Sequence, residues 1–404
     1  MFRTFVAGTL AALVGAGAGA QTILSESDYL SLVDGSHPAA VAAAEELAIA
    51  RSNLVAASTF DNPSIGLVRE DPSGDAAQTD AMISWQLPDF GRRLEIEARK
   101  KEVAAAQARL GLERAALRVS MREAYADWAL ASARADRLLS QRTRLEELAR
   151  REARRAESGE VSGLEARRLL LAASALGAQH ALASATEEEM RARARRWSSR
   201  VPADAKPLLP ATSAIAETAE QHPLVLAAEA DLAAALAAEG AAKRFLRSPE
   251  LMAGWQRQEG GADSVDGPLY GINWSMPLFG RNQAGRSAAA ARVEAARARL
   301  DQARREVEAR RQGALAAYRR LAEQIEAISP TMEGNDRMLE GAEAAFLLGE
   351  ASLTDLLETH RSVTEAELAL LELRESALAA SRELQRLGFL DSSHTPNDSK
   401  EPNS

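Results

Sequence analysis

Apolar residues recur every seven positions along most of this chain. The stretch 92–158 contains no proline and keeps one seven-residue register through Leu110, Leu117, Leu138 and Leu145. The same spacing continues through residues 169–190, 300–328 and 356–384. Sustained heptads predict long helices that pack against one another as coiled coils. At about 1.5 Å per residue, the helix over 92–158 would be roughly 100 Å long.

Four shorter segments alternate apolar and polar residues with a period of two. In the clearest of them, Tyr270, Ile272 and Trp274 alternate with Gly271 and Asn273. This alternation predicts strands with one apolar and one polar face. We expect strands near residues 62–70, 79–87, 249–258 and 267–276, joined in pairs by the turn-forming sequences at 71–75 and 260–263.

The same order of features occurs twice. Residues 84–92 (SWQLPDFGR) return as residues 273–281 (NWSMPLFGR), and the sequence GEVS at 159–162 returns as GEAS at 349–352. These landmarks are shifted by about 190 residues, which indicates a duplicated half rather than a short repeat. Each half would contain a helix begun by proline (about 39–59 and 212–247), a pair of strands, a very long helix and a return helix.

The landmarks divide the chain into five parts. We expect a signal peptide at 1–20, a first repeat at 21–200, a linker at 201–211, a second repeat at 212–387 and a disordered tail at 388–404. The signal peptide prediction rests on an early Arg3, an apolar run over 5–14 and small residues before Gln21. No later stretch is recognised as a transmembrane helix, so a membrane would have to be crossed by strands.

Composition narrows the range of functions. The 404 residues carry a formal net charge of −9, which argues against nucleic-acid binding. The absence of cysteine removes disulfides and thiolate metal sites. The five histidines are scattered without the spacing of metal ligands, so we expect neither a metal site nor a cofactor. Because no catalytic motif is present, we do not expect an enzyme.

The number of strands limits how they could span a membrane. Membrane-spanning sheets close into barrels, and known barrels have at least about eight strands. A chain with four strands would therefore contribute them to a shared barrel, and three chains giving twelve strands is the simple solution. A small soluble sheet with one buried face fits the strand pattern equally well. The signal peptide and the long helices favour the barrel.

The double arrangement of helix, strand pair, Pro-x-Phe-Gly-Arg junction, long helix, Gly-x-x-Ser turn and return helix resembles the TolC-like outer-membrane efflux protein family. The resemblance implies a mainly α fold with a small β part, in which a homotrimer forms a twelve-stranded β-barrel in the bacterial outer membrane and a long periplasmic α-helical barrel. It also implies a tripartite efflux system, with a periplasmic adaptor (membrane fusion) protein and an inner-membrane RND-type pump as partners.

Within this family, residues 277–285 (PLFGRNQAG) and the mid-helix Pro330 resemble the CzcC-type cation-efflux branch, which implies heavy-metal cations as substrates. The chain lacks the lipidated cysteine of many members of that branch. A channel for drug efflux or type I protein secretion would share every feature except the branch motif. A periplasmic coiled-coil adaptor is a further alternative, but it would have neither four strands nor the doubled junction.

The two Gly-x-x-Ser turns are candidate contact sites. Glycine permits a positive φ at the end of a helix, and serine can cap the next helix. The resemblance implies that these helix–turn–helix tips contact the adaptor through six residues: Gly159, Glu160, Ser162, Gly349, Glu350 and Ser352. The alternative is that they are only turns.

Three residues near the second turn are candidates for a periplasmic constriction. Asp355 and Glu358 lie one helical turn apart on the same face, and they match the acidic aperture positions of the resembled family. Phe346 matches an aromatic residue that precedes the turn in that family. Under threefold symmetry the acids would form a ring that attracts cations and raises carboxylate pKa values by repulsion. The first-half equivalents are Glu165 and Arg168, and the alternative is a solvated helix face.

Overall fold

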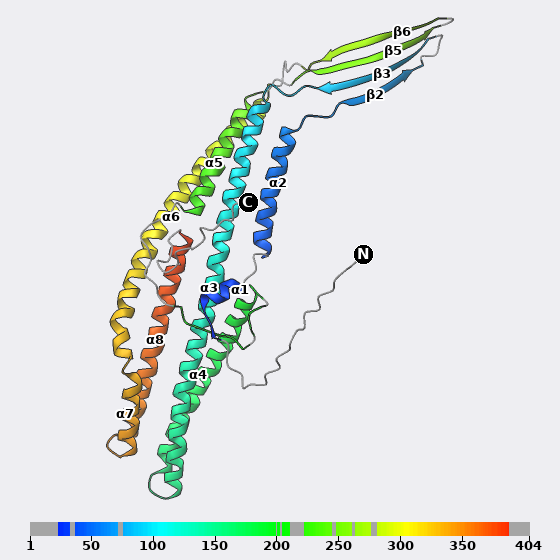
Figure 1. Ribbon diagram of the computed structural model, residues 1–404. Helices are drawn as coiled ribbons and strands as arrows, with labels where there is room; N and C mark the ends of the chain where they lie inside the picture. The colour runs from blue at the N-terminus through cyan, green and yellow to red at the C-terminus, as the bar shows by residue number, and fades with distance from the viewer. Residues whose placement is uncertain are drawn as a thin grey trace, which may run out of the picture. The chain divides into compact units, whose positions relative to one another are not determined.

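The computed structural model describes residues 23–32, 37–71, 76–198, 200–202, 204–210, 222–244, 248–260, 263–275 and 281–387. The predicted signal peptide, the second junction at 277–280 and the predicted tail lie outside these residues. Most of the described chain is helical, as expected: α1 (Glu26–Leu32), α2 (Pro38–Ser58), α3 (Arg92–Glu157), α4 (Gly163–Arg195), α5 (Pro223–Ala242), α6 (Gln283–Met332), α7 (Asn335–Leu347) and α8 (Leu353–Arg386) (Figure 1).

The predicted long helices are confirmed. The helix expected over 92–158 is α3, a continuous helix of 66 residues. Its second-half counterpart is interrupted two residues after Pro330, because α6 ends at Met332 and α7 begins at Asn335. Pro330 itself lies inside α6, and proline perturbs the turn that precedes it; the break falls at residues 333–334, where Gly334 is a poor helix former. The helix predicted over 212–247 is described only as α5, since residues 211–221 lie outside the description.

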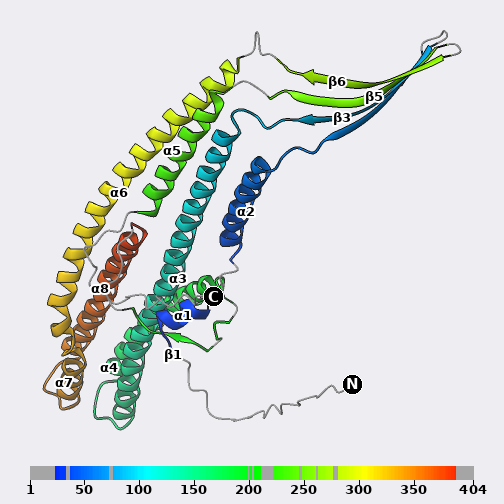
Figure 2. The ribbon, with the colours of Figure 1, turned by 45° about the horizontal axis from the view of Figure 1, so that its top comes forward.

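Four of the strands form one antiparallel sheet in the order β2 (Ser64–Glu70), β3 (Ala76–Gln86), β5 (Glu250–Gly260) and β6 (Asp263–Asn273). The four predicted strands are therefore present, with their ends displaced by a few residues. β6 ends at Asn273, so Trp274 follows the strand instead of continuing its alternation. The central pair, β3 and β5, joins the two halves of the duplication, and β2 and β6 are the edge strands (Figure 2).

The described residues divide into two compact units. Unit 1 draws on the ranges 1–34, 121–211 and 330–372, and unit 2 on 35–120, 212–329 and 373–404. Each unit therefore contains segments from both sequence halves, and α3 and α8 contribute residues to both. A duplicated sequence has folded into units that interleave its halves.

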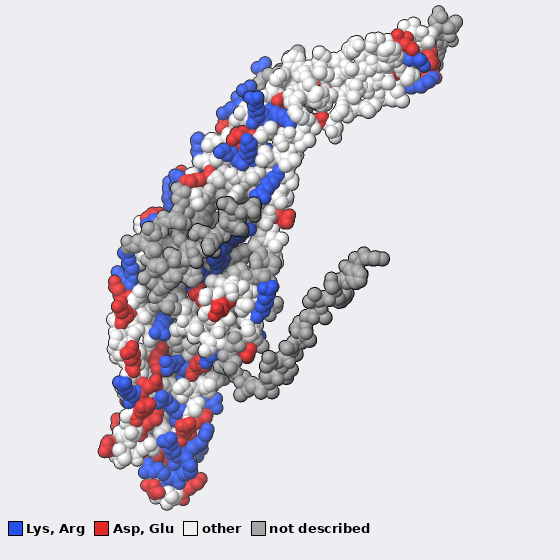
Figure 3. Space-filling view, viewed as in Figure 1, with Lys and Arg blue, Asp and Glu red and all other residues white. Residues whose placement is uncertain are grey.

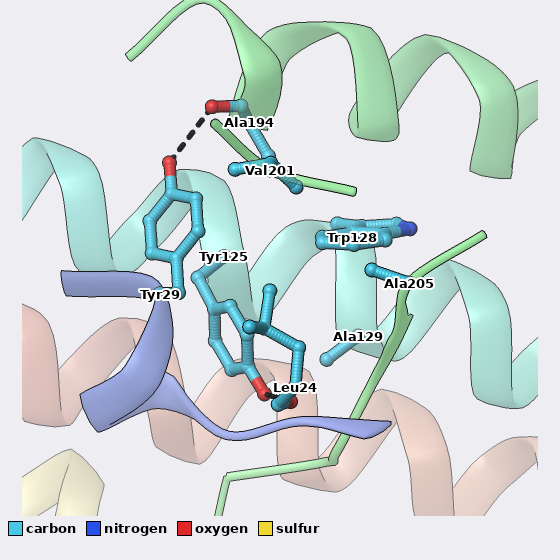
Figure 4. Packing of buried hydrophobic residues seen from close by; sticks show 8 residues of the cluster. All are labelled: Leu24, Tyr29, Tyr125, Trp128, Ala129, Ala194, Val201 and Ala205. Atoms are coloured by element: carbon cyan, nitrogen blue, oxygen red, sulfur yellow. Dashed lines mark hydrogen bonds between the residues drawn. The ribbon is translucent and has the colours of Figure 1, made fainter. Parts of the chain in front are cut away.

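Unit 1 is built around an aromatic cluster. Tyr29, Tyr125 and Trp128 are fully buried, and the two tyrosine rings are 5.4 Å apart (Figure 4). The Tyr29 hydroxyl donates to the carbonyl of Ala194 (2.9 Å) and the Tyr125 hydroxyl to that of Leu24 (2.6 Å). Burial raises the pKa of both tyrosines, since the charged phenolate would lose its hydration.

A short parallel pair of strands completes this cluster. β1 (Ile23–Leu24) pairs with β4 (Lys206–Pro207), which lies within the predicted linker. Val201 and Ala205 from the same segment are buried against the aromatic residues. The segment between the sequence halves is therefore part of the core of unit 1. Sequence periodicity could not reveal two-residue strands.

In unit 2 the short helices pack on the long ones through small residues. Ala43 and Leu47 of α2 meet Ala106 and Leu110 of α3 in one buried cluster. Tyr318 of α6 packs against the end of α8 in another. Alanine at these contacts lets helices approach closely, which is why so few aromatic residues suffice for the packing.

The turns from strand to long helix are held by side chains that cap the short helices. Arg92 donates to the carbonyls of Ala57 and Ser58 at the end of α2, and its guanidinium lies 4.0 Å from the centre of the Phe60 ring. In the second half, Asn282 adopts a positive φ of 57° and donates to the carbonyl of Ala242 at the end of α5 (3.1 Å). Carbonyls at the end of a helix lack intrahelical partners, so these contacts satisfy them.

One described helix, α4, is long and apolar enough to cross a membrane when judged by length and composition alone. The sequence predicts no transmembrane helix here, and the apolar stretch of α4 is flanked by Arg167 and Arg168 and by three consecutive glutamates at 187–189. A single helix of this kind is weak evidence for a membrane span.

Candidate functional site

The four-stranded sheet has two unlike faces. The register aligns Ile65 with Ile83 and Ile83 with Ala253, so alternate residues project to the same side. We call one side the apolar face: Ile65, Leu67, Ala81, Ile83, Trp85, Leu251, Ala253, Trp255, Pro268, Tyr270 and Ile272. Ile65 is 86% exposed and Tyr270 78% exposed. Large apolar side chains with this exposure indicate a surface that another apolar medium covers.

The opposite side, the glycine face, carries Val68, Val265 and Leu269 but consists mostly of polar side chains and of small or flexible residues: Ser64, Gly66, Met82, Ser84, Met252, Gly254, Gly267 and Gly271. A β-carbon at Gly254 would lie 2.4 Å from the carbonyl oxygen of Ala81, and one at Gly66 would lie 3.3 Å from Met82. Bulky residues on one face and glycines on the other favour a sheet that curves toward the glycines, as strands of a barrel do.

Charge also differs between the two faces. On the side of the apolar face, near the hairpin turns, Arg257 pairs with Asp266 (3.0 Å). The glycine face carries the carboxylates of Glu70, Asp80 and Glu250, and no lysine or arginine of the described strands projects from it. Most of the sheet surface visible in Figure 3 is free of charged side chains except near these turns.

The two predicted tips are turns with the same geometry. Gly159 has φ of +81° and Gly349 of +76°, the left-handed region that glycine tolerates. Glu160 donates its amide hydrogen to the carbonyl of Arg155 (2.9 Å), and Glu350 to that of Ala345 (2.8 Å). Ser162 accepts the amide hydrogen of Leu164 (3.2 Å) and so caps α4. Both turns are exposed at their glycine and glutamate positions.

At the second tip, Asp355 belongs to the cap of α8. Its carboxylate accepts from the hydroxyl and the amide of Ser352 (2.7 and 3.1 Å), while the Ser352 hydroxyl accepts from the Asp355 amide (3.2 Å). The Ser352 hydrogen bonds hold the pKa of Asp355 below its ordinary value in the single chain. Asp355 and Glu358 are both exposed on α8.

Phe346 has a different environment from the two acids. It is 7% exposed and packs in a buried cluster with Leu145, Leu169 and Leu356. The side chain therefore anchors the second tip against α3 and α4 from beneath, and its ring is not free to line an opening in this chain. In the first half, Arg168 is exposed and Glu165 is partly buried.

Comparison with known proteins identifies the chain. Residues 214–388 match the family model described as outer membrane efflux protein. The matched segment is the second copy of the duplication, and the landmarks of the first half repeat its order. Through its second half, the chain belongs to the outer membrane efflux protein family. Members are channels of the outer membrane with a helical extension in the periplasm, and this efflux protein has that location. No curated protein sequence matches it.

Solved structures share the fold of this efflux protein along most of its length. CusC, which forms a transmembrane channel, is 17% identical, with 93% of this chain and 95% of that chain covered and a TM-score of 0.70. VceC from Vibrio cholerae is 16% identical over 90% of this chain and 96% of its own, with a TM-score of 0.71. The open state of MtrE from Neisseria gonorrhoeae is 18% identical, covers 90% and 87%, and has a TM-score of 0.65. At these identities the likeness concerns the fold.

The efflux protein also contains a polar cluster that sequence reasoning did not find. His360 and Gln141 are each 2% exposed and lie together in unit 1. His360 lies four residues after Leu356 in the buried heptad of α8, and Gln141 lies between Leu138 and Leu145 in that of α3. The signal in the sequence is a polar residue at a heptad position that is otherwise apolar, which indicates a buried polar contact. Among the described residues, no group of three or more His, Asp or Glu side chains is arranged to hold a metal ion.

Proposed function

We propose that three copies of this efflux protein form the outer-membrane conduit of a tripartite exporter, and that the conduit carries heavy-metal cations. The family membership supports an efflux channel. The four-stranded sheet supports the trimer, because its two edge strands require neighbours in a bilayer and three copies supply twelve strands. In the closed barrel the apolar face would meet lipid and the glycine face would line the lumen.

The preference for cations rests on one observation: the surfaces that would line the channel carry negative charge. The carboxylates of the glycine face, Glu70, Asp80 and Glu250, have no basic residue beside them on that face. The segment 335–372, which bears Asp355 and Glu358, contains nine acidic and two basic residues. Rings of carboxylates raise the local concentration of cations and repel anions. Asp355 and Glu358 are our candidates for the constriction, with Phe346 supporting them from the core.

The partners follow from the family and from the two tips. We propose that Gly159, Glu160 and Ser162, together with the equivalent second-half positions Gly349, Glu350 and Ser352, meet a periplasmic adaptor, which connects the channel to an inner-membrane RND-type pump. Both tips expose a short polar turn between two helices. Such a surface can be contacted without opening the packed cores below it.

Recordings in planar lipid bilayers test cation conduction. We expect the D355N/E358Q double variant to raise single-channel conductance and to weaken block by divalent cations about tenfold, equivalent to about 1.4 kcal/mol of lost attraction. Asparagine can still accept hydrogen bonds from Ser352, so the turn remains capped. Ser352→Ala is the matched control, since it removes the cap hydroxyl and keeps both charges. Unchanged conductance and block in the double variant would exclude this constriction.

Growth assays test the substrate. Deletion of the gene in its own bacterium should sensitise the cells to divalent metals such as zinc, cobalt or cadmium and leave their tolerance of dyes and antibiotics unchanged. Wild-type protein supplied from a plasmid should restore metal tolerance. The opposite pattern would assign the channel to drug efflux, and a defect only in the release of a polypeptide would assign it to protein secretion.

A further inference from the structure

A buried histidine links three helices of unit 1. His360 of α8 is 2% exposed and lies between α3 and α7. Its Nδ1 is 3.3 Å from Oε1 of Gln141 on α3, and its Nε2 is 3.3 Å from Oε1 of Glu343 on α7. Both ring nitrogens therefore face an oxygen that can only accept a hydrogen bond.

The orientation of Gln141 is fixed by a further contact. Its amide nitrogen donates to the carboxylate of Glu367 on α8 (3.4 Å), which turns its oxygen toward His360. Glu367 is also paired with Arg137 (3.6 Å). A neutral imidazole has one N–H donor and one lone pair. The carboxylate of Glu343 is a stronger acceptor than the amide oxygen of Gln141, so the N–H of the neutral ring belongs on Nε2, and the lone pair of Nδ1 then faces Gln141.

The two contacts of His360 together need two protons, and the neutral ring carries only one. Nε2 of His360 and Oε1 of Glu343 are both buried, and neither atom has another hydrogen-bond partner. Arg144 of α3 lies 3.9 Å from Oε1 of Glu343, and the same guanidinium pairs with Asp336 (3.0 Å). A proton on Nε2 gives both buried atoms a partner, and a second proton on Nδ1 converts this contact into a charge-assisted hydrogen bond.

We propose that His360 is a proton-operated latch that binds the α7–α8 hairpin to α3. In the protonated state the imidazolium donates to Gln141 and to Glu343 at once and ties the three helices together. In the neutral state the N–H on Nε2 still donates to Glu343, but Nδ1 and the Gln141 oxygen are then two acceptors facing each other, so the hairpin separates from α3 more readily. The periplasm takes its pH from the surroundings, and histidine is the side chain that changes charge between pH 5 and 8.

The latch acts on the part of the chain that carries the candidate constriction. His360 is five residues from Asp355 along α8, and Glu343 is three residues from Phe346 at the end of α7. Acidic conditions would hold this hairpin closed on α3, and neutral or alkaline conditions would release it. All of these contacts lie within unit 1, and the latch does not depend on which substrate the channel carries.

Hydrogen exchange of the full-length protein in detergent or nanodiscs tests the latch. After correction for the intrinsic pH dependence of exchange, we expect amides of residues 335–360 in the wild type to be protected about tenfold more at pH 5.5 than at pH 8, as expected for one hydrogen bond to a charged group. His360→Gln and Glu343→Gln should each abolish this difference. Because Glu343 is partly exposed at its side chain, its variant alters the core least.

His180→Gln on α4 is the matched control, because it removes a histidine of unit 1 that is only partly buried, and it should keep the wild-type pH dependence. The latch is refuted if wild-type protection is independent of pH, or if the difference persists in both His360→Gln and Glu343→Gln. A loss of the difference in His180→Gln as well would also refute it, since the effect would then be a general response of the hairpins.

Discussion

At the scale of single residues, the two His-Pro pairs each begin a helix, and the histidine caps it. His37 and His222 precede α2 and α5, and the Nδ1 atom of each accepts an amide hydrogen from the first turn. Only the neutral imidazole can accept, so these histidines serve as N-caps. The sequence indicated the helix starts because proline is favoured there. It did not indicate the caps, since histidine is an uncommon residue at this position.

The cap of α5 predicts an acid-sensitive helix start. Burial lowers the pKa of His222, an effect partly offset by the Arg386 carbonyl and the charge of Glu383. The unfolded chain therefore binds the proton more tightly, and the contribution of His222 to stability is complete above the ordinary pKa of about 6.5 and lost as the pH falls through the folded-state pKa. Protonation should cost about 1 kcal/mol of the cap.

Hydrogen exchange in the first turn of α5 checks this prediction. In the wild type, protection of the Leu224 amide should fall on acidification from pH 7.5 to pH 5, after correction for intrinsic exchange. His222→Asn provides a cap that does not titrate and should remove the fall. A fall of equal size in the variant would show that another group controls this turn. The expected direction is opposite to that for the His360 latch, so the two effects can be told apart in one experiment.

The contacts of Arg92 could not be predicted from local residue patterns. The repeated Pro-x-Phe-Gly-Arg element marked the change from strand to long helix, and the structure places that change there in the first half. The partners of the guanidinium, Ala57, Ser58 and Phe60, lie more than thirty residues earlier in the chain. No local pattern connects them. The second half uses Asn282 for the same purpose, which is one position beyond the aligned Arg281.

At the scale of elements, long helices were the most predictable feature and very short strands the least. Heptads over many turns and the absence of proline defined α3 almost to its ends. The two-residue strands β1 and β4 carry no periodicity, and their pairing joins residues more than 180 positions apart. For the four-stranded sheet, the sequence predicts which side chains lie on the same face, because the alternation of apolar and polar residues fixes this.

Helix α4 carries apolar residues on two sides, one buried and one exposed. Leu169 and Ala173 are buried against neighbouring helices of unit 1, whereas Leu171 is 65% and Leu182 73% exposed. The exposed leucines, eleven residues apart, fall on one side of the helix. A second apolar stripe on a helix that already packs along one side fits an assembly in which helices of neighbouring copies complete a ring. The same stripe explains why α4 has the composition of a membrane helix.

At the scale of the whole molecule, the sequence locates the residues of the candidate site but does not predict the surroundings of their side chains. Gly159 and Gly349 follow from the repeat order, and Asp355 and Glu358 follow from the family resemblance. The structure describes the glycines at exposed turns and the acids on an exposed helix face. The burial of Phe346 and the capping of Asp355 depend on side-chain directions near the turn. Those directions follow from packing, which a linear pattern does not encode.

The glycine face yields a prediction about assembly. Gly254→Ala should reduce the yield of heat-resistant trimers and lower their dissociation temperature by about 5 °C, because the new β-carbon collides with the main chain at Ala81. Gly267→Ala is the matched control, since it lies on the same face and a β-carbon there meets nothing within 4 Å. Gel electrophoresis of unboiled samples from outer-membrane extracts measures both. Equal behaviour of the two variants would mean that close packing on this face does not limit barrel formation.

The interleaving of the two units sets the order in which an exported chain can complete its fold. β1 leaves the secretion machinery first, but β4 follows more than 180 residues later, so the amino-terminal strand must wait unpaired while the first hairpin crosses. α8 supplies residues to both units and follows the other described elements in chain order. Neither unit can therefore finish before α8 has crossed, and forming contacts over such long stretches of chain is slow. Until then, a nascent chain exposes the apolar residues that Leu356 and Leu384 of α8 cover in the folded protein.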